Sequence, residues 1–181
     1  AVQWTVASGG NGHWYLFDIR KEGWQASKNV AIAMGGYLAT ITSKNENSFM
    51  DNYLRSLPIA RNSQGYGPFL GGYQITQGNP CNECQWAWVT NEPWQFAPWN
   101  SGEPNNASRA GGSEDYLAVL YGEFWNDVNQ DGDSGYTNSG FLIEWSPTAS
   151  DCNANGIPDS CDLANGGDCN NNGLLDACET F

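Results

Sequence analysis

Five oxygen-bearing side chains occur in one segment of the chain, between residues 99 and 127. They are Glu103, Asn105, Glu114, Asn126 and Asp127. Carboxylate and amide oxygens are hard ligands, and Ca²⁺ accepts about 6–8 of them in irregular geometry. This segment therefore predicts a calcium site. The alternative is a solvated acidic loop that holds no metal ion.

The acidic residues are unevenly distributed along the chain. Residues 1–109 contain seven Lys/Arg and seven Asp/Glu, whereas residues 110–181 contain thirteen Asp/Glu and no Lys or Arg. The formal net charge of −13 thus lies in the C-terminal part. Such a block of negative charge repels phosphate backbones and anionic lipid surfaces, so we expect no nucleic-acid partner and no membrane binding through basic patches.

Length and composition bound the class of protein. With 181 residues, of which 40% are hydrophobic, the chain can bury one good core and a small appendage. No apolar run approaches the roughly 20 residues of a membrane helix, so we expect no membrane insertion, and the N-terminal residues lack the features of a signal peptide. Six Cys at patterned spacings suggest an oxidising compartment, and hence a mature secreted or cell-surface protein.

Enzymatic chemistry finds little support in the sequence. His13 is the only His, and the chain has no nucleophile elbow, no HExxH motif and no Gly-rich phosphate loop. Glu103 with Glu114 or Asp127 could in principle form a glycosidase pair. Because calcium binding accounts for the same carboxylates, we expect that the protein is not an enzyme.

Two helices and several short strands are expected to position these residues. Apolar and aromatic patterning predicts the order strand 13–19, helix 24–35, strand 37–41 and helix 45–57. Ser43 followed by Glu46 forms a capping-box signature for the second helix, which ends before Pro58.

The middle of the chain, from about residue 71 to residue 124, is rich in Gly, Pro, Asn and Trp. It shows little periodicity apart from predicted strands at 85–89 and 116–121, and FLIEW (141–145) follows as a final strand. Long irregular segments in compact domains are commonly binding loops. Four aromatic residues could anchor this loop on the body of the protein: Trp86, Trp88, Trp94 and Trp99.

Cys81 and Cys84 are separated by two residues inside this loop. A C-x-x-C pair can be a redox or zinc motif, but no thioredoxin-like strand and helix surround it and His13 is the only candidate His ligand. A local structural disulfide is the better prediction.

The chain ends in an internal repeat. DCNANGIPDSCD (151–162) and DCNNNGLLDACE (168–179) align without gaps. Acidic or amide residues at positions 1, 3, 5 and 9, Gly at position 6 and a carboxylate at position 12 match the logic of an EF-hand-type calcium loop.

Several stretches of the sequence resemble the C-type lectin domain family. They are GGYLATITSKNEN (35–47), FLGG (69–72), QWAWVTNEPWQFAPWNSGEPN (85–105) and FWND (124–127). The resemblance covers about residues 10–147. Its specific part is the combination of EPN and WND at this separation, with ED between them.

The resemblance implies an α+β fold with two helices, small antiparallel sheets and a long irregular binding loop. It also implies that the five side chains from Glu103 to Asp127 hold a principal Ca²⁺ and bind a sugar through two vicinal hydroxyls, with Pro104 in the cis form. In this family EPN accompanies mannose-type sugars (mannose, fucose, glucose and GlcNAc), and QPD accompanies galactose. Asp115 is either an auxiliary calcium ligand or an exposed Asp, and Trp94 and Trp99 either stack on sugar or anchor the loop.

The sequence departs from the family pattern where framework Cys are expected. Tyr116 follows the ED pair, and Trp145 closes the final strand. The body of the domain must therefore rely on its apolar core.

The tail resembles the short calcium repeats of thrombospondin type 3 and dockerin modules. The resemblance implies these ligands: Asp151, Asn153, Asn155, Asp159 and Asp162 in the first loop, and Asp168, Asn170, Asn172, Asp176 and Glu179 in the second. The four Cys of the tail allow three pairings. The tail is too small to fold on a hydrophobic core, so metal and disulfides must stabilise it.

We therefore expect two units, a C-type lectin-like carbohydrate-recognition domain at 1–147 and an EF-hand-like calcium-repeat tail at 148–181. The expected function is Ca²⁺-dependent binding of mannose-type glycans as a recognition module of an extracellular protein. The alternative is a calcium-dependent protein-interaction or adhesion module that binds no sugar.

Overall fold

The computed structural model describes most of the first expected unit. The described residues are 1–57, 67–79, 81–107, 112–120, 122–131 and 139–147. Both calcium repeats of the tail, with all of their predicted ligands from Asp151 to Glu179, lie outside the described residues. The tail and the division into two units thus stay predictions.

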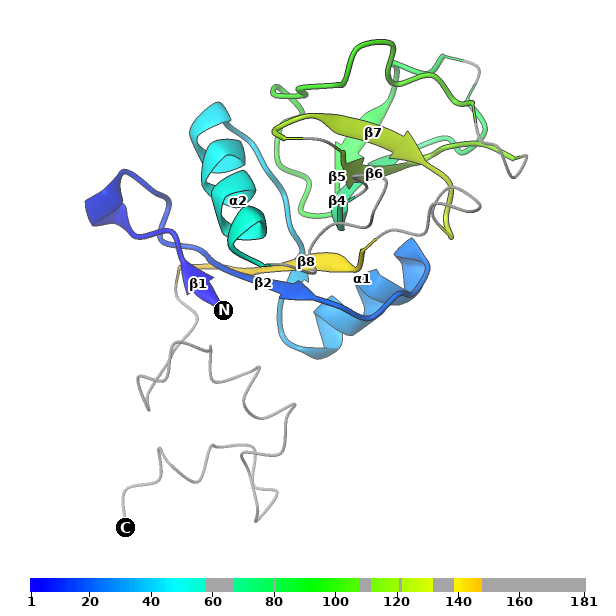
Figure 1. The fold of residues 1–181 in the computed structure, drawn as a ribbon. Coiled ribbons are helices and arrows are strands. Elements are labelled where there is room, and N and C mark those ends of the chain that lie inside the picture. Colours follow the sequence, from blue (N-terminus) through cyan, green and yellow to red (C-terminus); the bar gives the residue numbers. More distant parts are fainter. Residues whose placement is uncertain (58–66, 80, 108–111, 121, 132–138, 148–181) are drawn as a thin grey trace, which may run out of the picture.

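The two predicted helices are confirmed. Helix α1 spans Trp24–Ala33 and helix α2 spans Lys44–Ser56 (Figure 1). The α2 helix begins where the capping box predicts, because the Ser43 side chain accepts a hydrogen bond from the Glu46 N–H at 3.2 Å. The Glu46 carboxylate reaches back to the N–H of Thr42 at 2.8 Å, one residue before the cap. No helix in the described part of the chain is long and apolar enough to cross a membrane.

The described strands form one mixed sheet. Their bounds are β1 Val2–Gln3, β2 Trp14–Asp18, β3 Tyr37–Leu38, β4 Phe69–Gln74, β5 Trp86–Trp88, β6 Tyr116–Val119, β7 Trp125–Val128 and β8 Phe141–Trp145. The main order is β1-β2-β8-β4-β6-β7, with β3 paired to β8 and β5 paired to β4. All pairs are antiparallel except β4 with β8. The predicted α+β class with short strands is confirmed.

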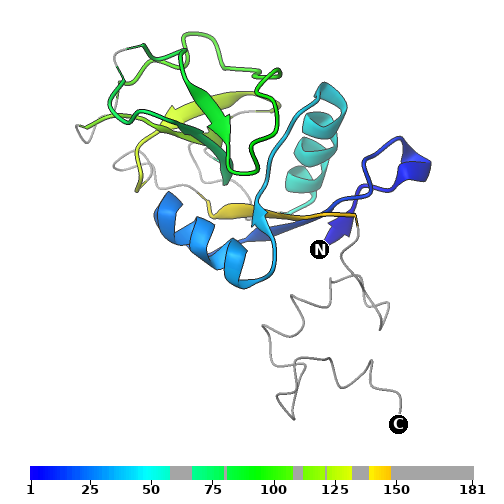
Figure 2. The ribbon, with the colours of Figure 1, turned by 180° about the vertical axis from the view of Figure 1, so that it is seen from behind.

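Strand β8 organises the core. It pairs with β2 over five residue pairs, from Trp14↔Trp145 to Asp18↔Phe141, so the beginning and the end of the described domain lie side by side. Its side chains alternate between two apolar clusters. Leu142 packs in the cluster that contains Met50 and Leu54 of α2. Phe141, Ile143 and Trp145 pack in the cluster that contains residues of α1. The two helices accordingly lie on opposite sides of β8 in both views (Figures 1 and 2).

Tyr116 and Trp145, which stand where framework Cys were expected, are both buried. Trp145 is 1% exposed, and its indole N–H donates to the Met34 carbonyl at 2.9 Å. The ring centroids of Tyr116 and Trp24 are 4.7 Å apart. Since Trp24 begins α1 and Met34 is its C-cap, Tyr116 and Trp145 attach both ends of the helix to the sheet.

A buried polar cluster lies between β2, β8 and the N-terminus of α2. Glu144, which is 1% exposed, accepts a hydrogen bond from the Thr40 N–H at 2.7 Å and contacts Nδ1 of His13. Glu46 accepts a hydrogen bond from the Tyr15 hydroxyl at 2.6 Å. Burial raises the pKa of the Glu144 carboxyl, and the hydrogen bond to Glu144 raises the pKa of His13. The only His of the chain is partly buried and contacts the buried Glu144, far in sequence from the C-x-x-C pair.

Candidate functional site

The five predicted calcium ligands come from three segments that the fold brings together. The loop after β5 supplies two of them, the segment before β6 one, and β7 two: Glu103, Asn105, Glu114, Asn126 and Asp127. Strands β6 and β7 pair antiparallel over four residues. A β-bridge between Trp99 and Trp125 attaches the loop to β7. Sheet pairing therefore places the three segments next to one another.

Asp127 joins the loop to β7. Its side chain is 1% exposed, its Oδ1 accepts the Asn105 N–H at 3.1 Å, and its Oδ2 accepts the Asn106 N–H at 2.7 Å. Burial raises the pKa of Asp127, and these backbone N–H groups act in the opposite direction.

Glu114 forms hydrogen bonds with the same loop through both its side chain and its backbone. Its Oε2 accepts the Ala107 N–H at 2.8 Å, and Oδ1 of Asn105 accepts the same N–H at 2.7 Å. The N–H of Glu114 donates to Oδ1 of Asn106 at 2.6 Å. Asn106 was not among the residues predicted for this site. The sequence feature that could have pointed to Asn106 is the Asn-Asn pair at 105–106. The backbone of Asn106 has φ = 52°, a left-handed conformation that Asn adopts more readily than most residues.

The donor set fits a calcium ion. Oδ1 of Asn126 is buried and accepts no hydrogen bond within the described part of the protein. Leaving a buried polar atom unsatisfied costs about 1–3 kcal/mol, and a coordinated cation would remove that cost. Oε2 of Glu103 is also buried, and the Glu103–Pro104 peptide bond is cis, as the resemblance implies. Carboxylate and amide oxygens of this kind are the ligands Ca²⁺ prefers.

The side chains are, however, largely occupied by hydrogen bonds of the loop itself. Among the described residues, no group of three or more His, Cys, Asp or Glu side chains is gathered as metal ligands would be. Two of the five candidates are amides, and the oxygens of Asp127 and Glu114 accept hydrogen bonds from backbone N–H groups of the loop. Calcium binding by the five residues therefore stays a prediction.

Trp residues anchor the long loop. Trp88 and Trp125 are fully buried, and the centroid of the Trp94 ring lies 4.5 Å from that of Trp88 and 6.1 Å from that of Trp125. The ring centroid of Trp99 lies 4.9 Å from that of Trp86. Trp94 and Trp99 are partly buried against the core cluster, which favours the anchoring interpretation over stacking on sugar.

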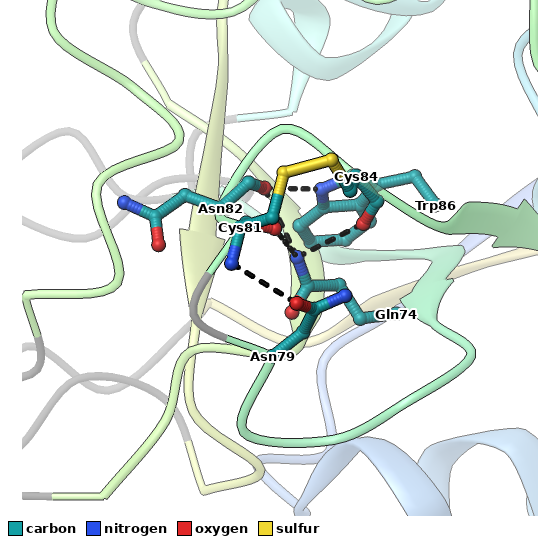
Figure 3. The surroundings of a disulfide bond; sticks show 6 residues. All are labelled: Gln74, Asn79, Cys81, Asn82, Cys84 and Trp86. Atoms are coloured by element: carbon teal, nitrogen blue, oxygen red, sulfur yellow. Dashed lines mark hydrogen bonds between the residues drawn. A yellow bond between two sulfur atoms is a disulfide. The ribbon is translucent and has the colours of Figure 1, made fainter.

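The predicted disulfide between Cys81 and Cys84 is confirmed, and Figure 3 shows its surroundings. The Gln74 side-chain amide lies within hydrogen-bond distance of the carbonyls of Cys81, Asn82 and Cys84, at 3.3, 3.0 and 3.2 Å. The indole N–H of Trp86 donates to the Asn82 carbonyl at 2.9 Å. A side chain of β4 and one of β5 thus hold this small loop, in agreement with the predicted structural disulfide.

Asp115 is not the exposed residue that one alternative supposed. It is 3% exposed, its Oδ1 accepts the Gly78 N–H at 2.8 Å, and its Oδ2 accepts the Ser113 hydroxyl. These contacts attach the segment before β6 to the loop after β4.

No protein-family model matches the chain. Among curated proteins, the chain is 30% identical over 116 residues to a perlucin-like protein of Mytilus galloprovincialis. The matched region covers 63% of this chain and 67% of that protein. It is 28% identical over 117 residues to C-type lectin domain family 4 member G of Mus musculus, covering 65% of this chain. Since the match covers 35% of member G, the chain spans about a third of that relative's length.

Solved structures resemble the described fold. The mouse scavenger receptor C-type lectin carbohydrate-recognition domain matches with a TM-score of 0.59 and 22% identity, covering 76% of this chain and 92% of that one. Human lithostathine matches with a TM-score of 0.58 and 14% identity, covering 76% of this chain and 94% of that one. At these identities the likeness concerns the fold.

Proposed function

Since the chain belongs to the C-type lectin-like family, we propose that it binds mannose-type glycans through a calcium ion held by Glu103, Asn105, Glu114, Asn126 and Asp127. The observation that carries the proposal is the buried Oδ1 of Asn126, which finds no hydrogen-bond donor among the described residues. An oxygen in this state suits a cation better than it suits a hydrogen-bonded loop.

A calcium ion bound there would supply open coordination positions for two vicinal hydroxyls of a sugar. The side chains themselves would select the sugar, because carboxylates only accept hydrogen bonds whereas amide groups also donate. Glu103 with Asn105, and Glu114 with Asn126, can each accept from one hydroxyl and donate to it. Asp127 would hold the loop against β7 through the N–H groups of Asn105 and Asn106.

The comparisons support carbohydrate binding as the class of function. Several curated relatives are named lectins, among them ladderlectin of Oncorhynchus mykiss. One structural neighbour is a cow C-type carbohydrate-recognition domain of CD23, solved in the presence of a GlcNAc2Man3 oligosaccharide. We therefore propose reversible binding and no catalysis, and the Cys81–Cys84 disulfide supports an extracellular or cell-surface location.

The test uses a glycan array and immobilised mannose, each with calcium and with EDTA. We expect retention on mannose with calcium and release by EDTA. In the double variant Glu103→Gln with Asn105→Asp, the preference should move from mannose toward galactose. The matched control is Glu83→Gln with Asn82→Asp in the disulfide loop, which makes the same exchange of acid and amide away from the site and should keep the mannose preference.

Two results would contradict the proposal. An unchanged sugar profile in the double variant would mean that Glu103 and Asn105 do not determine the sugar preference. Calcium-dependent stability without competition by any monosaccharide would favour the alternative, a calcium-dependent protein-interaction or adhesion module.

A further inference from the structure

Trp125 lies at the junction of the two segments that carry most of the candidate ligands. It directly precedes Asn126 and Asp127 on β7. Its backbone N–H donates to the Pro98 carbonyl at 3.0 Å, and its carbonyl accepts the Asn100 N–H at 2.9 Å. The position of Trp125 therefore determines how β7 faces the loop that contains Glu103 and Asn105.

The indole of Trp125 is in turn held by Asn47, in the first turn of α2. Oδ1 of Asn47 accepts the Trp125 Nε1–H at 3.0 Å, and its Nδ2 donates to the Glu123 carbonyl at 2.7 Å. The Asn47 side chain is buried, with 4% exposure. An indole can only donate and a carbonyl can only accept, so these two partners fix the orientation of the amide. The neighbouring Ser48 adds a hydrogen bond from its hydroxyl to Glu123 Oε1 at 2.9 Å.

We propose that Asn47 is a positioning residue for the calcium site, an inference that rests on the proposed function. One side chain binds residues 123 and 125, on both sides of the entry into β7, and so fixes the strand just before its two candidate ligands. Asn47 itself is not among the five candidate ligands. It acts through Trp125, in the way that outer-shell partners orient the ligands of a metal.

The experiment compares Asn47→Leu, which removes both hydrogen bonds, with Asn47→Asp, which keeps the acceptor for Trp125 and loses the donor to Glu123. Asn52→Leu, at an exposed position of the same helix, is the matched control. Calcium dissociation constants are measured from the change in Trp fluorescence, because all nine Trp lie before residue 148 and the predicted calcium loops of the tail contain none. Outer-shell substitutions weaken metal affinity by about 10- to 100-fold, so we expect a loss in this range for Asn47→Leu, a smaller loss for Asn47→Asp and none for Asn52→Leu.

A second readout does not require calcium. In EDTA, hydrogen exchange of the Trp125 indole N–H is measured by NMR, and urea unfolding gives the stability of each variant. We expect faster indole exchange in Asn47→Leu than in Asn47→Asp. If Asn47→Leu does not fold, the comparison of Asn47→Asp with wild type still tests the proposal.

The outcomes separate this inference from the proposed function. Wild-type protein that binds no calcium would overturn both. Wild-type protein that binds calcium, together with Asn47 variants that bind it equally well and lose only stability in EDTA, would leave the proposed function intact and overturn the positioning role.

Discussion

Replacing Asn126 with Leu should separate the stability of the metal-free protein from its response to calcium. Asn126 is 5% exposed, and its Oδ1 is buried without a hydrogen-bond donor among the described residues. Such an oxygen costs the folded state about 1–3 kcal/mol, and an apolar side chain of similar shape removes that cost. We therefore expect that metal-free Asn126→Leu is as stable as wild type, or more stable by about 1 kcal/mol.

With calcium present, the order of stability of Asn126→Leu and wild type should be reversed. A ligand present at 100 times its dissociation constant raises the free energy of unfolding by about 2.7 kcal/mol. If the loss of one oxygen ligand weakens binding about 100-fold, the same calcium concentration stabilises the variant by only about 0.4 kcal/mol. The variant should thus be at least as stable as wild type in EDTA and less stable than wild type in calcium.

The assay is urea unfolding of both proteins in EDTA and in calcium, followed by Trp fluorescence. Asn52→Leu, at an exposed position of α2, serves as the control and should differ from wild type by less than about 0.5 kcal/mol in both conditions. A loss of more than about 1 kcal/mol in EDTA would mean that Oδ1 of Asn126 has a stabilising partner. An undiminished gain from calcium would mean that Asn126 is no ligand.

Two further predictions concern the core. His13→Gln should destabilise the protein in EDTA, and most strongly below pH 6.5. The reason is that the hydrogen bond to Glu144 raises the pKa of His13 above 6.5 in the folded protein. The stabilisation from protonated His13 is therefore complete at low pH and is lost as the pH rises through that raised pKa. Urea unfolding between about pH 6 and pH 9 measures the difference, and a difference that does not shrink with rising pH would contradict it. Trp145→Phe should cost about 2 kcal/mol, since it removes the hydrogen bond to the Met34 carbonyl and leaves unfilled space, and should lower the melting temperature by about 5 °C. Thermal unfolding checks this, and an unchanged melting temperature would show that the indole contact contributes nothing.

The helices and the longer strands were predictable because their signals are local. The Ser43 cap and the apolar spacing of 45–57 define α2 within a few residues, and the observed helix is Lys44–Ser56. The aromatic runs likewise define β2 and β8. Strand β1 was not predicted, because two residues carry no periodic pattern and their structure depends on pairing with β2.

The pairing of these elements was less predictable from the residues alone. The pairs between β2 and β8 join residues more than a hundred positions apart, such as Trp14 and Trp145. A run such as FLIEW predicts a strand, but nothing in its composition selects its neighbours. The order β1-β2-β8-β4-β6-β7 was therefore not predicted from the sequence, whereas the α+β class was, and the structural neighbours support that class at the level of the fold.

In the candidate site, the residues that would bind the ion were predictable from the sequence, whereas the residue that holds them in place was not. Ligand chemistry restricts the five residues to oxygen-bearing types, and this restriction made Glu103, Asn105 and Asp127 conspicuous in the sequence. Asn47 gave no such signal, because an Asn in the first turn of a helix is compatible with capping, exposure or burial. Only its two partners, which lie more than seventy residues away, distinguish it. Residues that hold a site in place are therefore harder to predict than residues that form it, because their types are common and their partners are distant in sequence.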